Sequence, residues 1–240
     1  MKNLQNKTVL ITGGTKGIGY GIAEALLAEG MNVAVTSRSQ EAAEEAAEKL
    51  NKKAKKGNGE AFGTEADVRS PESQQKAVDK TVEKFGGIDV LIANAGVGHF
   101  AGIEDLSADD WNATIDTNLT GVFYSVKAAV EHIKKSKGYI ITIASLAGTN
   151  FFAKGAAYNA SKFGLVGFTQ AIMMDLRQHD VKVTTIMPGS VATHFNGNEP
   201  DDSDAWKIQP EDLGQMTVDL LKMHERTLPS KVEVRPAKPA

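Results

Sequence analysis

The stretch AYNASK, residues 157–162, places a phenol and an amine four residues apart. In a helix, Tyr158 and Lys162 lie one turn apart on the same face, close enough to interact. A free phenol with a pKa near 10 is a poor acid–base group at neutral pH, and a nearby ammonium lowers that pKa because it favours the phenolate. The pair indicates a tyrosine tuned for proton transfer, and the alternative is a chance pair at the solvent edge of a buried helix.

A glycine-rich turn is the second candidate site. TGGTKGIG, residues 12–19, follows a buried-strand pattern and precedes an amphipathic helix pattern. Such a turn requires unusual backbone angles and lets a pyrophosphate approach the backbone at a helix N-terminus. The spacing of Gly13, Gly17 and Gly19 differs from the commoner dinucleotide fingerprint. Because methyltransferases and flavoproteins also use glycine-rich turns, this motif alone leaves the ligand open.

The end of the second expected strand bears on which nucleotide fits. An acidic residue about 20 positions after the glycines would bind a ribose 2′-hydroxyl, and this chain has Ser37 and Arg38 there instead. The guanidinium of Arg38 offers a fork of hydrogen-bond donors, and Lys16, inside the glycine turn, offers a point charge. Both would attract a 2′-phosphate, whereas a carboxylate at the strand end would repel it. The sequence therefore predicts NADP(H) in preference to NAD(H).

Composition narrows the class of protein. The chain has 240 residues, 41% of them hydrophobic, with a net charge of −3 and no cysteine. This charge predicts no general attraction to nucleic acid or an anionic membrane, and the lack of cysteine excludes disulfides, thiol catalysis and Cys-ligated metals. No His, Asp or Glu cluster has metal-ligand spacing, so we predict no metal. Without an apolar signal-like core or a run of about 18 apolar residues, we expect a soluble cytoplasmic protein.

Short β-branched runs alternate with longer amphipathic stretches along the chain. Strands are expected at 8–12, 32–37, 60–66, 89–94, 139–145, 181–189 and 231–235. Helices are expected at 18–30, 40–56, 71–85, about 109–135, from about 157 onward, and 210–224. This alternation predicts an α/β protein with a parallel sheet covered by helices on both faces. Since no repeat or linker appears, we expect a single domain over residues 1–240.

Several further motifs occur in a specific order with these two. They are Asp67-Val68, NAG at 94–96, Asn118 in TNLTG, Ser145 in IAS, and PG at 188–189. Ser145 precedes Tyr158 by 13 residues, from the end of one expected strand to the start of the next helix. Over nearly its whole length the chain resembles the short-chain dehydrogenases/reductases, specifically the single-domain Tyr-x-x-x-Lys branch.

The resemblance implies a doubly wound Rossmann fold of seven parallel strands ordered 3-2-1-4-5-6-7, and a catalytic set of Asn118, Ser145, Tyr158 and Lys162. It implies that Asp67 and Val68 hold the adenine and that Thr193 lies beside the nicotinamide carboxamide. The full set of implied cofactor contacts is Gly13, Thr15, Lys16, Gly17, Ile18, Gly19, Ser37, Arg38, Asp67, Val68, Asn94, Ala95, Gly96, Tyr158, Lys162, Pro188, Gly189, Val191 and Thr193. One departure is Ala93, where the family usually has Asn, which removes a polar contact but keeps the glycine turn.

The chemistry of these residues agrees with those roles. Reducing a ketone requires a hydride donor, a proton donor and stabilisation of the developing oxyanion, and Ser145 can donate a hydrogen bond to the substrate oxygen. Asn118 is a poor helix former in the middle of a long expected helix. It indicates a local kink whose freed carbonyl could hold a water behind Lys162.

The leading interpretation is an NADPH-dependent carbonyl reductase, reversible as an alcohol dehydrogenase. The alternative is reduction of a 3-oxoacyl thioester carried by acyl-carrier protein or coenzyme A. Glu131 and His179 stand where the carrier-dependent subfamily has basic residues for docking, which argues against the carrier but leaves a coenzyme A thioester open. Two other classes are a non-catalytic NADP-binding sensor and a methyltransferase, although the latter has no need of Tyr-x-x-x-Lys.

Other side chains fall where a substrate could lie. We interpret His99 and His194 as loop histidines. Trp206 with Phe195 either closes an apolar lid or anchors the polar loop, and Phe151–Phe152 lines the pocket or contacts a subunit. The resemblance implies a homodimer or homotetramer, and the apolar run FGLVGFTQAIMM fits an interface or a core-facing helix. The expected partner is a small-molecule carbonyl substrate, with no nucleic acid and no membrane.

Overall fold

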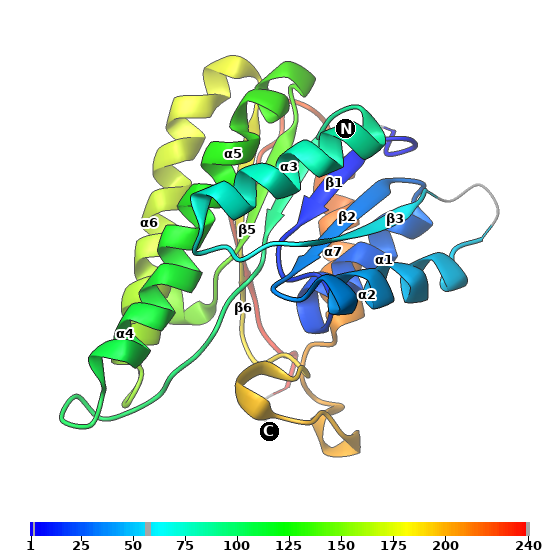
Figure 1. Cartoon of the computed structure of the whole chain (residues 1–240). Helices are drawn as coiled ribbons and strands as arrows, with labels where there is room; N and C mark the ends of the chain where they lie inside the picture. Colours follow the sequence, from blue (N-terminus) through cyan, green and yellow to red (C-terminus); the bar gives the residue numbers. More distant parts are fainter. Residues whose placement is uncertain (2, 56–58, 239–240) are drawn as a thin grey trace.

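All the expected strands form and join one parallel sheet. The computed structural model describes residues 1, 3–55 and 59–238, and within them the sheet has seven strands in the order β3-β2-β1-β4-β5-β6-β7 (Figure 1). The strands are β1 Thr8–Ile11, β2 Asn32–Ser37, β3 Ala61–Glu65, β4 Val90–Ala93, β5 Tyr139–Ile143, β6 Lys182–Pro188 and β7 Lys231–Val234. This confirms the predicted Rossmann topology. The order reverses between β1 and β4, and in such sheets ligands bind at this crevice, outside the carboxyl ends of the strands.

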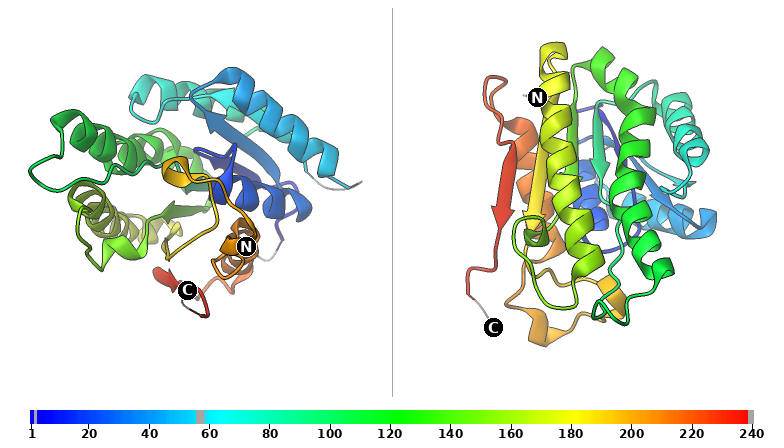
Figure 2. Two further views of the ribbon diagram at one scale, coloured as in Figure 1. Left: turned by 90° about the horizontal axis from the view of Figure 1, so that it is seen from below. Right: turned by 90° about the vertical axis from the view of Figure 1, so that its left-hand side faces the viewer.

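Side chains along each strand alternate between two buried cores. In β1, Val9 and Ile11 pack in one core with helices on one face of the sheet, whereas Leu10 packs in the other core with helices on the opposite face. A sheet that is buried on both faces needs apolar residues at consecutive positions, which is why TVLI and VLIA lack a polar alternation. Figure 2 shows the resulting helix layers on the two sides of the sheet.

The helices begin and end near the residues that their capping signals predict. They are α1 Gly17–Ala28, α2 Gln40–Lys53, α3 Pro71–Phe85, α4 Ala108–Ile115, α5 Gly121–Ser136, α6 Ala156–Leu176 and α7 Pro210–Lys222. The Ser70 hydroxyl caps α3 by accepting from the Ser73 amide, with Pro71 as the first helical residue. α2 ends at Lys53 rather than at residue 56, which lies outside the described residues. No helix in the described ranges is long and apolar enough to cross a membrane.

The helix expected at about 109–135 is interrupted. α4 passes into a π-helical turn, Asp116–Thr120, before α5 begins. Asn118 lies in this turn and is completely buried. The irregularity that we expected at Asn118 is therefore present, as a widened turn within a continuous run of helix.

Candidate active site

A cavity of about 810 Å³ is lined by the loops that follow the carboxyl ends of the strands. It brings together most of the residues that the sequence motifs indicate. They are Gly13, Thr15, Lys16, Gly17, Ile18, Ser37, Arg38, Asp67, Val68, Asn94, Ala95, Gly96, Ser145, Tyr158, Pro188, Gly189, Val191 and Thr193. Three expected residues, Gly19, Asn118 and Lys162, lie behind the cavity wall and are buried. The loops after six strands thus contribute to one concave site.

The glycine turn is fastened to the loop after β4. The side-chain amide of Asn94 donates to the carbonyl oxygens of Thr12 (3.0 Å) and Gly13 (2.9 Å). The Thr12 hydroxyl accepts in return from the backbone N–H groups of Asn94 (3.0 Å) and Ala95 (3.2 Å). Gly13 has φ +65°, and a Cβ there would lie 2.9 Å from the Ala95 Cα. Only glycine satisfies both the left-handed backbone and this close approach.

The unusual glycine spacing has a packing reason. A Cβ at Gly19 would lie 2.5 Å from the Asn94 side-chain nitrogen and 2.6 Å from the Gly13 carbonyl oxygen. Gly19 therefore lets α1 approach the loop after β4 and does not itself face the cavity. Ala93, where the family pattern departs, is buried among apolar side chains of the core. Its methyl group fits that position without a polar partner.

The N-terminus of α1 fits a phosphate group. Lys16 is its N-cap residue with extended backbone, and no side chain caps the first turn. The first backbone N–H groups of a helix lack intrahelical partners and carry a positive partial charge. Because Gly13 and Gly17 present no Cβ to the cavity, an anion could approach these N–H groups closely. The donor set and the space suit the pyrophosphate of a dinucleotide.

The far end of the cavity contains a cationic cluster that the sequence motifs revealed only in part. Lys16 and Arg38 are exposed and line this end, as expected. Arg69 lines it too, and we did not predict it. The sequence feature that could have indicated Arg69 is its position two residues after Asp67, in the loop that follows β3. Three cations thus line the cavity on the loops after β1, β2 and β3, and Asp67 is the one carboxylate in the described lining.

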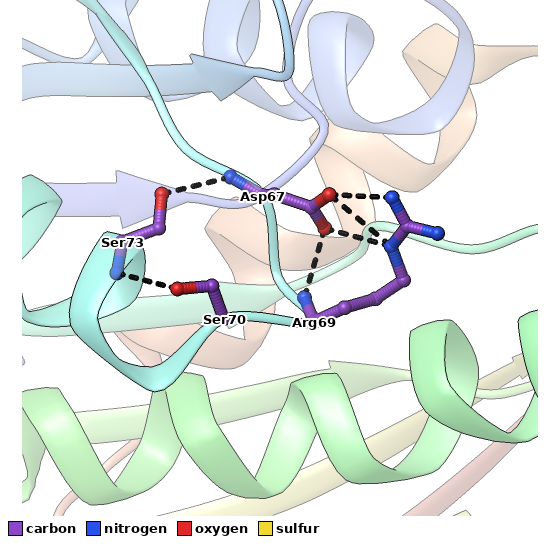
Figure 3. Close-up of polar contacts among 4 residues, drawn as sticks. All are labelled: Asp67, Arg69, Ser70 and Ser73. Carbon is purple, nitrogen blue, oxygen red and sulfur yellow. Dashed lines mark hydrogen bonds and ion pairs between the residues drawn. The ribbon is translucent and has the colours of Figure 1, made fainter.

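Arg69 binds the carboxylate that the family resemblance assigns to adenine (Figure 3). Its guanidinium lies 2.6 Å from one Asp67 oxygen and its Nε donates to the other at 3.0 Å. The Asp67 backbone N–H donates to the Ser73 hydroxyl, which ties this loop to α3. The hydrogen bonds from Arg69 hold the pKa of Asp67 below its usual value, and the charge of Arg38 adds to this effect. Asp67 is therefore an anion clamped in place.

Tyr158 and Lys162 lie one turn apart on α6, as the sequence predicts. The Lys162 amine donates to the Ile143 carbonyl oxygen at 3.0 Å, at the end of β5, and lies 5.6 Å from the centre of the Tyr158 ring. A Cβ at Gly96 would lie 3.8 Å from that amine, so the amine lies just behind the loop after β4. Lys162 is only 4% exposed, and burial lowers its pKa to about 8.

We expected a lowered pKa for Tyr158, and for the protein without a bound cofactor this expectation was wrong. Burial raises the pKa of the phenol, and the hydrogen bond with the Ser145 side chain only partly offsets this. The reason is that a buried phenolate loses its hydration. The Lys162 amine meanwhile donates to the Ile143 carbonyl oxygen and is itself poorly solvated. At neutral pH the phenol consequently keeps its proton.

Ser145 lies between the end of β5 and the start of the loop before α6. Its hydroxyl accepts from the Ala147 backbone N–H at 3.1 Å and donates to the Pro188 carbonyl oxygen at 3.4 Å. These contacts fix its side chain at the cavity wall beside Tyr158. The spacing of 13 residues noted in the sequence thus runs from the second residue after β5 to the third residue of α6.

Asn118 uses its side chain to join three segments. Its side-chain oxygen accepts from the Val97 N–H at 2.8 Å, and its nitrogen donates to the Val97 oxygen at 2.8 Å and to the Ser161 hydroxyl at 3.1 Å. The π-helical turn is therefore tied both to the loop after β4 and to α6. A water behind Lys162 remains a prediction.

The other expected side chains divide between the cavity and the surface. His99 and His194 line the cavity, and each pairs with an acid at 3.1 Å, Asp110 and Glu199 respectively. Phe195 lies against Tyr158, whereas the ring of Trp206 lies beneath the amine of Lys207. Phe151, 85% exposed, lies at the surface.

The buried Lys162 makes the stability of the protein depend on pH. Between about pH 8 and 10.5 the unfolded chain holds a proton on this amine that the folded chain has lost, so stability rises with pH in that window. Lys162→Met removes this dependence. We expect the free energy of unfolding of Lys162→Met to exceed that of the unmodified protein at about pH 7. This difference should shrink by about 2 kcal/mol between about pH 7 and about pH 9.5, as measured by urea unfolding. Lys135→Met, at an exposed site, should give a pH-independent difference, and the same flat result for Lys162→Met would contradict the assignment.

Comparison with known proteins identifies the family of this chain. The family model described as short chain dehydrogenase matches residues 7–204. A trans-4-hydroxycyclohexanecarboxylate dehydrogenase from Sinomonas cyclohexanicum is 40% identical over 189 residues, which cover 78% of this chain and 73% of the relative. A 3-oxoacyl-(acyl-carrier-protein) reductase from Synechocystis is 36% identical over 200 residues, which cover 82% of this chain and 79% of the relative.

Comparison with solved structures supports the same family through the fold. An alcohol dehydrogenase from the archaeon Thermococcus sibiricus, complexed with 5-hydroxy-NADP, has a TM-score of 0.90 and 28% sequence identity. The match covers 98% of this chain and 99% of that one. Such folds bind a nicotinamide cofactor, which the glycine turn and the cavity described above can accommodate. From the family match, the sequence identities and the fold together, the chain belongs to the short-chain dehydrogenase/reductase family of oxidoreductases.

Proposed function

We propose that this protein is an NADP(H)-dependent oxidoreductase that interconverts a carbonyl group and a secondary alcohol. The observation that carries the proposal is the pairing of Tyr158 with Ser145 at one end of a cavity whose other end is cationic. The lining residues run from Gly13 to Lys207, which supports one combined nucleotide-binding and catalytic domain over residues 1–240. The cysteine-free composition supports a cytoplasmic location.

In the proposed reduction, Ser145 donates a hydrogen bond to the carbonyl oxygen and Tyr158 transfers its proton there. The raised pKa of the phenol suits this role, because the group arrives protonated at neutral pH. The Lys162 ammonium, behind the ring, stabilises the phenolate that remains. The nicotinamide, when bound, supplies the hydride. In the oxidation direction the phenolate form of Tyr158 accepts the alcohol proton. Asn118 is proposed to hold α6 and the loop after β4 in register.

The preference for NADP(H) is supported by charge at the adenosine end. Lys16, Arg38 and Arg69 outnumber the single carboxylate of Asp67, which is already bound by Arg69. A 2′-phosphate would therefore meet a net positive site. The structural relative from Thermococcus sibiricus, which was solved with an NADP derivative, is consistent with this choice.

Reduction of a 3-oxoacyl thioester is the second candidate, favoured by the Synechocystis relative. Glu131, where carrier docking calls for a basic residue, is exposed and paired with Lys134 at 3.0 Å. This acid disfavours an acidic carrier protein, so a coenzyme A thioester is the form that we retain. A non-catalytic nucleotide sensor is the remaining alternative.

A screen of NADPH oxidation separates these candidates. Ketones, aldehydes, quinones and acetoacetyl-coenzyme A are each mixed with the protein, and loss of NADPH absorbance is followed. We expect turnover with simple ketones or aldehydes that exceeds turnover with the thioester. Thioester turnover alone would favour the second candidate. NADPH binding without turnover of any carbonyl compound would support the sensor and contradict the proposal.

We further propose a homodimer or homotetramer that assembles through α5 and α6, which run side by side (Figure 2). Phe123, Phe163 and Met174 on these helices are partly exposed, and an apolar groove lies between the two helices. Burying such residues between subunits removes apolar surface from water.

The substitution Phe123→Glu tests this interface. A charge placed in a buried apolar contact is strongly unfavourable, so we expect monomers where the unmodified protein forms dimers or larger assemblies, measured by sedimentation velocity. Lys76→Glu, at an exposed site on α3, is the control and should keep the assembly. A monomeric unmodified protein would refute the interface.

A further inference from the structure

We infer that the substrate is a neutral carbonyl compound with an apolar ring, and that Phe100, Phe152 and Phe195 contact this ring. These three residues are called the aromatic cluster below. The inference rests on the proposed carbonyl–alcohol activity and narrows its substrate class. It depends on the arrangement of the three rings around Tyr158, on the backbone contacts that hold them, and on the charges nearby.

Two rings of the aromatic cluster contact the phenol that we propose as the proton donor, and the third contacts Phe100. Phe100 approaches Tyr158 edge-on, with ring centres 5.5 Å apart and planes at 67°. Phe195 packs on Tyr158 at 5.7 Å, and Phe152 extends the cluster from Phe100 at 5.8 Å. These separations are those of favourable aromatic pairs. Any group bound beside the Tyr158 ring therefore lies next to aromatic carbon.

Backbone contacts hold two of these rings in place. The loop with Phe100 meets the loop with Phe152 through a bridge in which the Ala101 N–H donates to the Lys154 oxygen at 3.1 Å. Asn159, next to Tyr158 on α6, accepts from the Phe152 N–H at 3.4 Å and donates to two carbonyl oxygens of the same loop at 2.8 Å. The positions of the rings are thus set by the helix that carries the phenol.

Gly98 makes room for the rings. A Cβ at this residue would lie 2.7 Å from Cζ of Phe195 and 2.9 Å from Cζ of Phe100. Its missing side chain lets the loop after β6, which carries Phe195, meet the loop after β4, which carries Phe100. The cluster is thus assembled from three separate loops that converge beside Tyr158.

The rings keep exposed area that the fold does not use. Phe100 is 38% exposed and Phe152 48% exposed, although both lie in the group around the proposed proton donor. Partly exposed aromatic faces beside a reacting group offer contact area to an apolar ligand. Contact with a flat ring would remove this area from water and gain aromatic packing.

The charged residues at the Tyr158 end of the cavity disfavour an anionic substrate. Here the lining contains His99, His194 and Lys207. Each is already within 3.1 Å of an acid, Asp110, Glu199 and Asp204 respectively. The cations at the other end of the cavity are proposed to bind the nucleotide, so they are not available to the substrate. A carboxylate on the substrate would therefore lack an unpaired cation among the described residues of this part of the lining.

Matched ketones test the inference. We would measure kcat/KM with NADPH for acetophenone, for butanone and for 4-acetylbenzoate, which adds a carboxylate to acetophenone. We expect kcat/KM for acetophenone to exceed that for butanone by about tenfold or more, as burial of a ring implies. It should exceed that for 4-acetylbenzoate by about tenfold as well, because the carboxylate would lack a cationic partner. Phe195→Ala should lower the acetophenone-to-butanone ratio about tenfold, and Phe195→Leu, which keeps apolar volume, by less. Phe151→Ala, at the exposed neighbouring phenylalanine, should leave the ratio unchanged.

The outcomes distinguish this inference from the proposed function. Equal kcat/KM values for acetophenone and butanone, or a ratio unaffected by Phe195→Ala, would overturn the role of the aromatic cluster while ketone reduction still stands. A preference for 4-acetylbenzoate would overturn the neutral substrate. Failure to reduce any ketone would overturn both the inference and the proposed function. Thermal unfolding and NADPH binding check that each variant is folded.

Discussion

Tyr158→Phe is expected to lower kcat for carbonyl reduction by about 10²–10⁴-fold, the usual contribution of a positioned acid or base. The substitution keeps the ring that packs between Phe100 and Phe195 and removes only the hydroxyl group. NADPH binding should therefore persist, with a dissociation constant changed by less than about threefold. Stopped-flow or steady-state NADPH oxidation gives kcat, and fluorescence titration gives the binding constant.

Tyr124→Phe is the matched control for this experiment. Tyr124 lies on α5, where its ring contacts Phe123, and it does not line the cavity among the described residues. Loss of its hydroxyl should leave kcat unchanged. If Tyr158→Phe also leaves kcat unchanged, another group transfers the proton and the proposed mechanism is wrong.

Arg38→Asp is expected to change the cofactor preference. The ratio of kcat/KM with NADPH to that with NADH should fall by about 100-fold, because one charge-assisted hydrogen bond is lost and a repulsive carboxylate is gained. The added carboxylate also offers the ribose 2′-hydroxyl of NADH an acceptor. Steady-state kinetics with both cofactors, at fixed ionic strength, measures the ratio.

Arg177→Asp makes the same change of charge at a residue that does not line the cavity as described. It controls for the general effect of net charge on an anionic cofactor and should leave the ratio within about twofold. An unchanged ratio for Arg38→Asp would mean that Lys16 and Arg69 bind the 2′-phosphate without it, or that the protein prefers NADH. Either result would mean that Arg38 does not determine the preference for NADP(H).

Local signals predicted the framework well. Every strand and most helix ends lie where β-branched runs, the Ser70–Pro71 cap and Gly30 indicate, because these features depend on neighbouring residues. Asn118 marked the irregular turn for the same reason. Its bonds to Val97 and Ser161 were beyond prediction, because they join segments 21 and 43 residues away.

Burial and long-range pairing account for what the sequence did not reveal. The spacing of Tyr158 and Lys162 predicted their proximity but not the cost of burying a phenolate, so the direction of the Tyr158 pKa shift was wrong. Phe100 went unnoticed since its place depends on the bridge between Ala101 and Gly155. Arg69 was missed although Asp67 is only two residues away, because its place in the cavity depends on the loops after β1, β2 and β3 meeting in the fold.

The side chain of Asn118 has a consequence for how ligands enter. It fastens the strand-four loop, at Val97, to the helix bearing the proposed acid, so this wall of the site moves as a single unit. Entry and exit then fall to residues 194–198, which carry His194 and Phe195 and make few backbone hydrogen bonds to the rest of the described chain. Opening of this segment, rather than chemistry, would then be the slow event of each turnover.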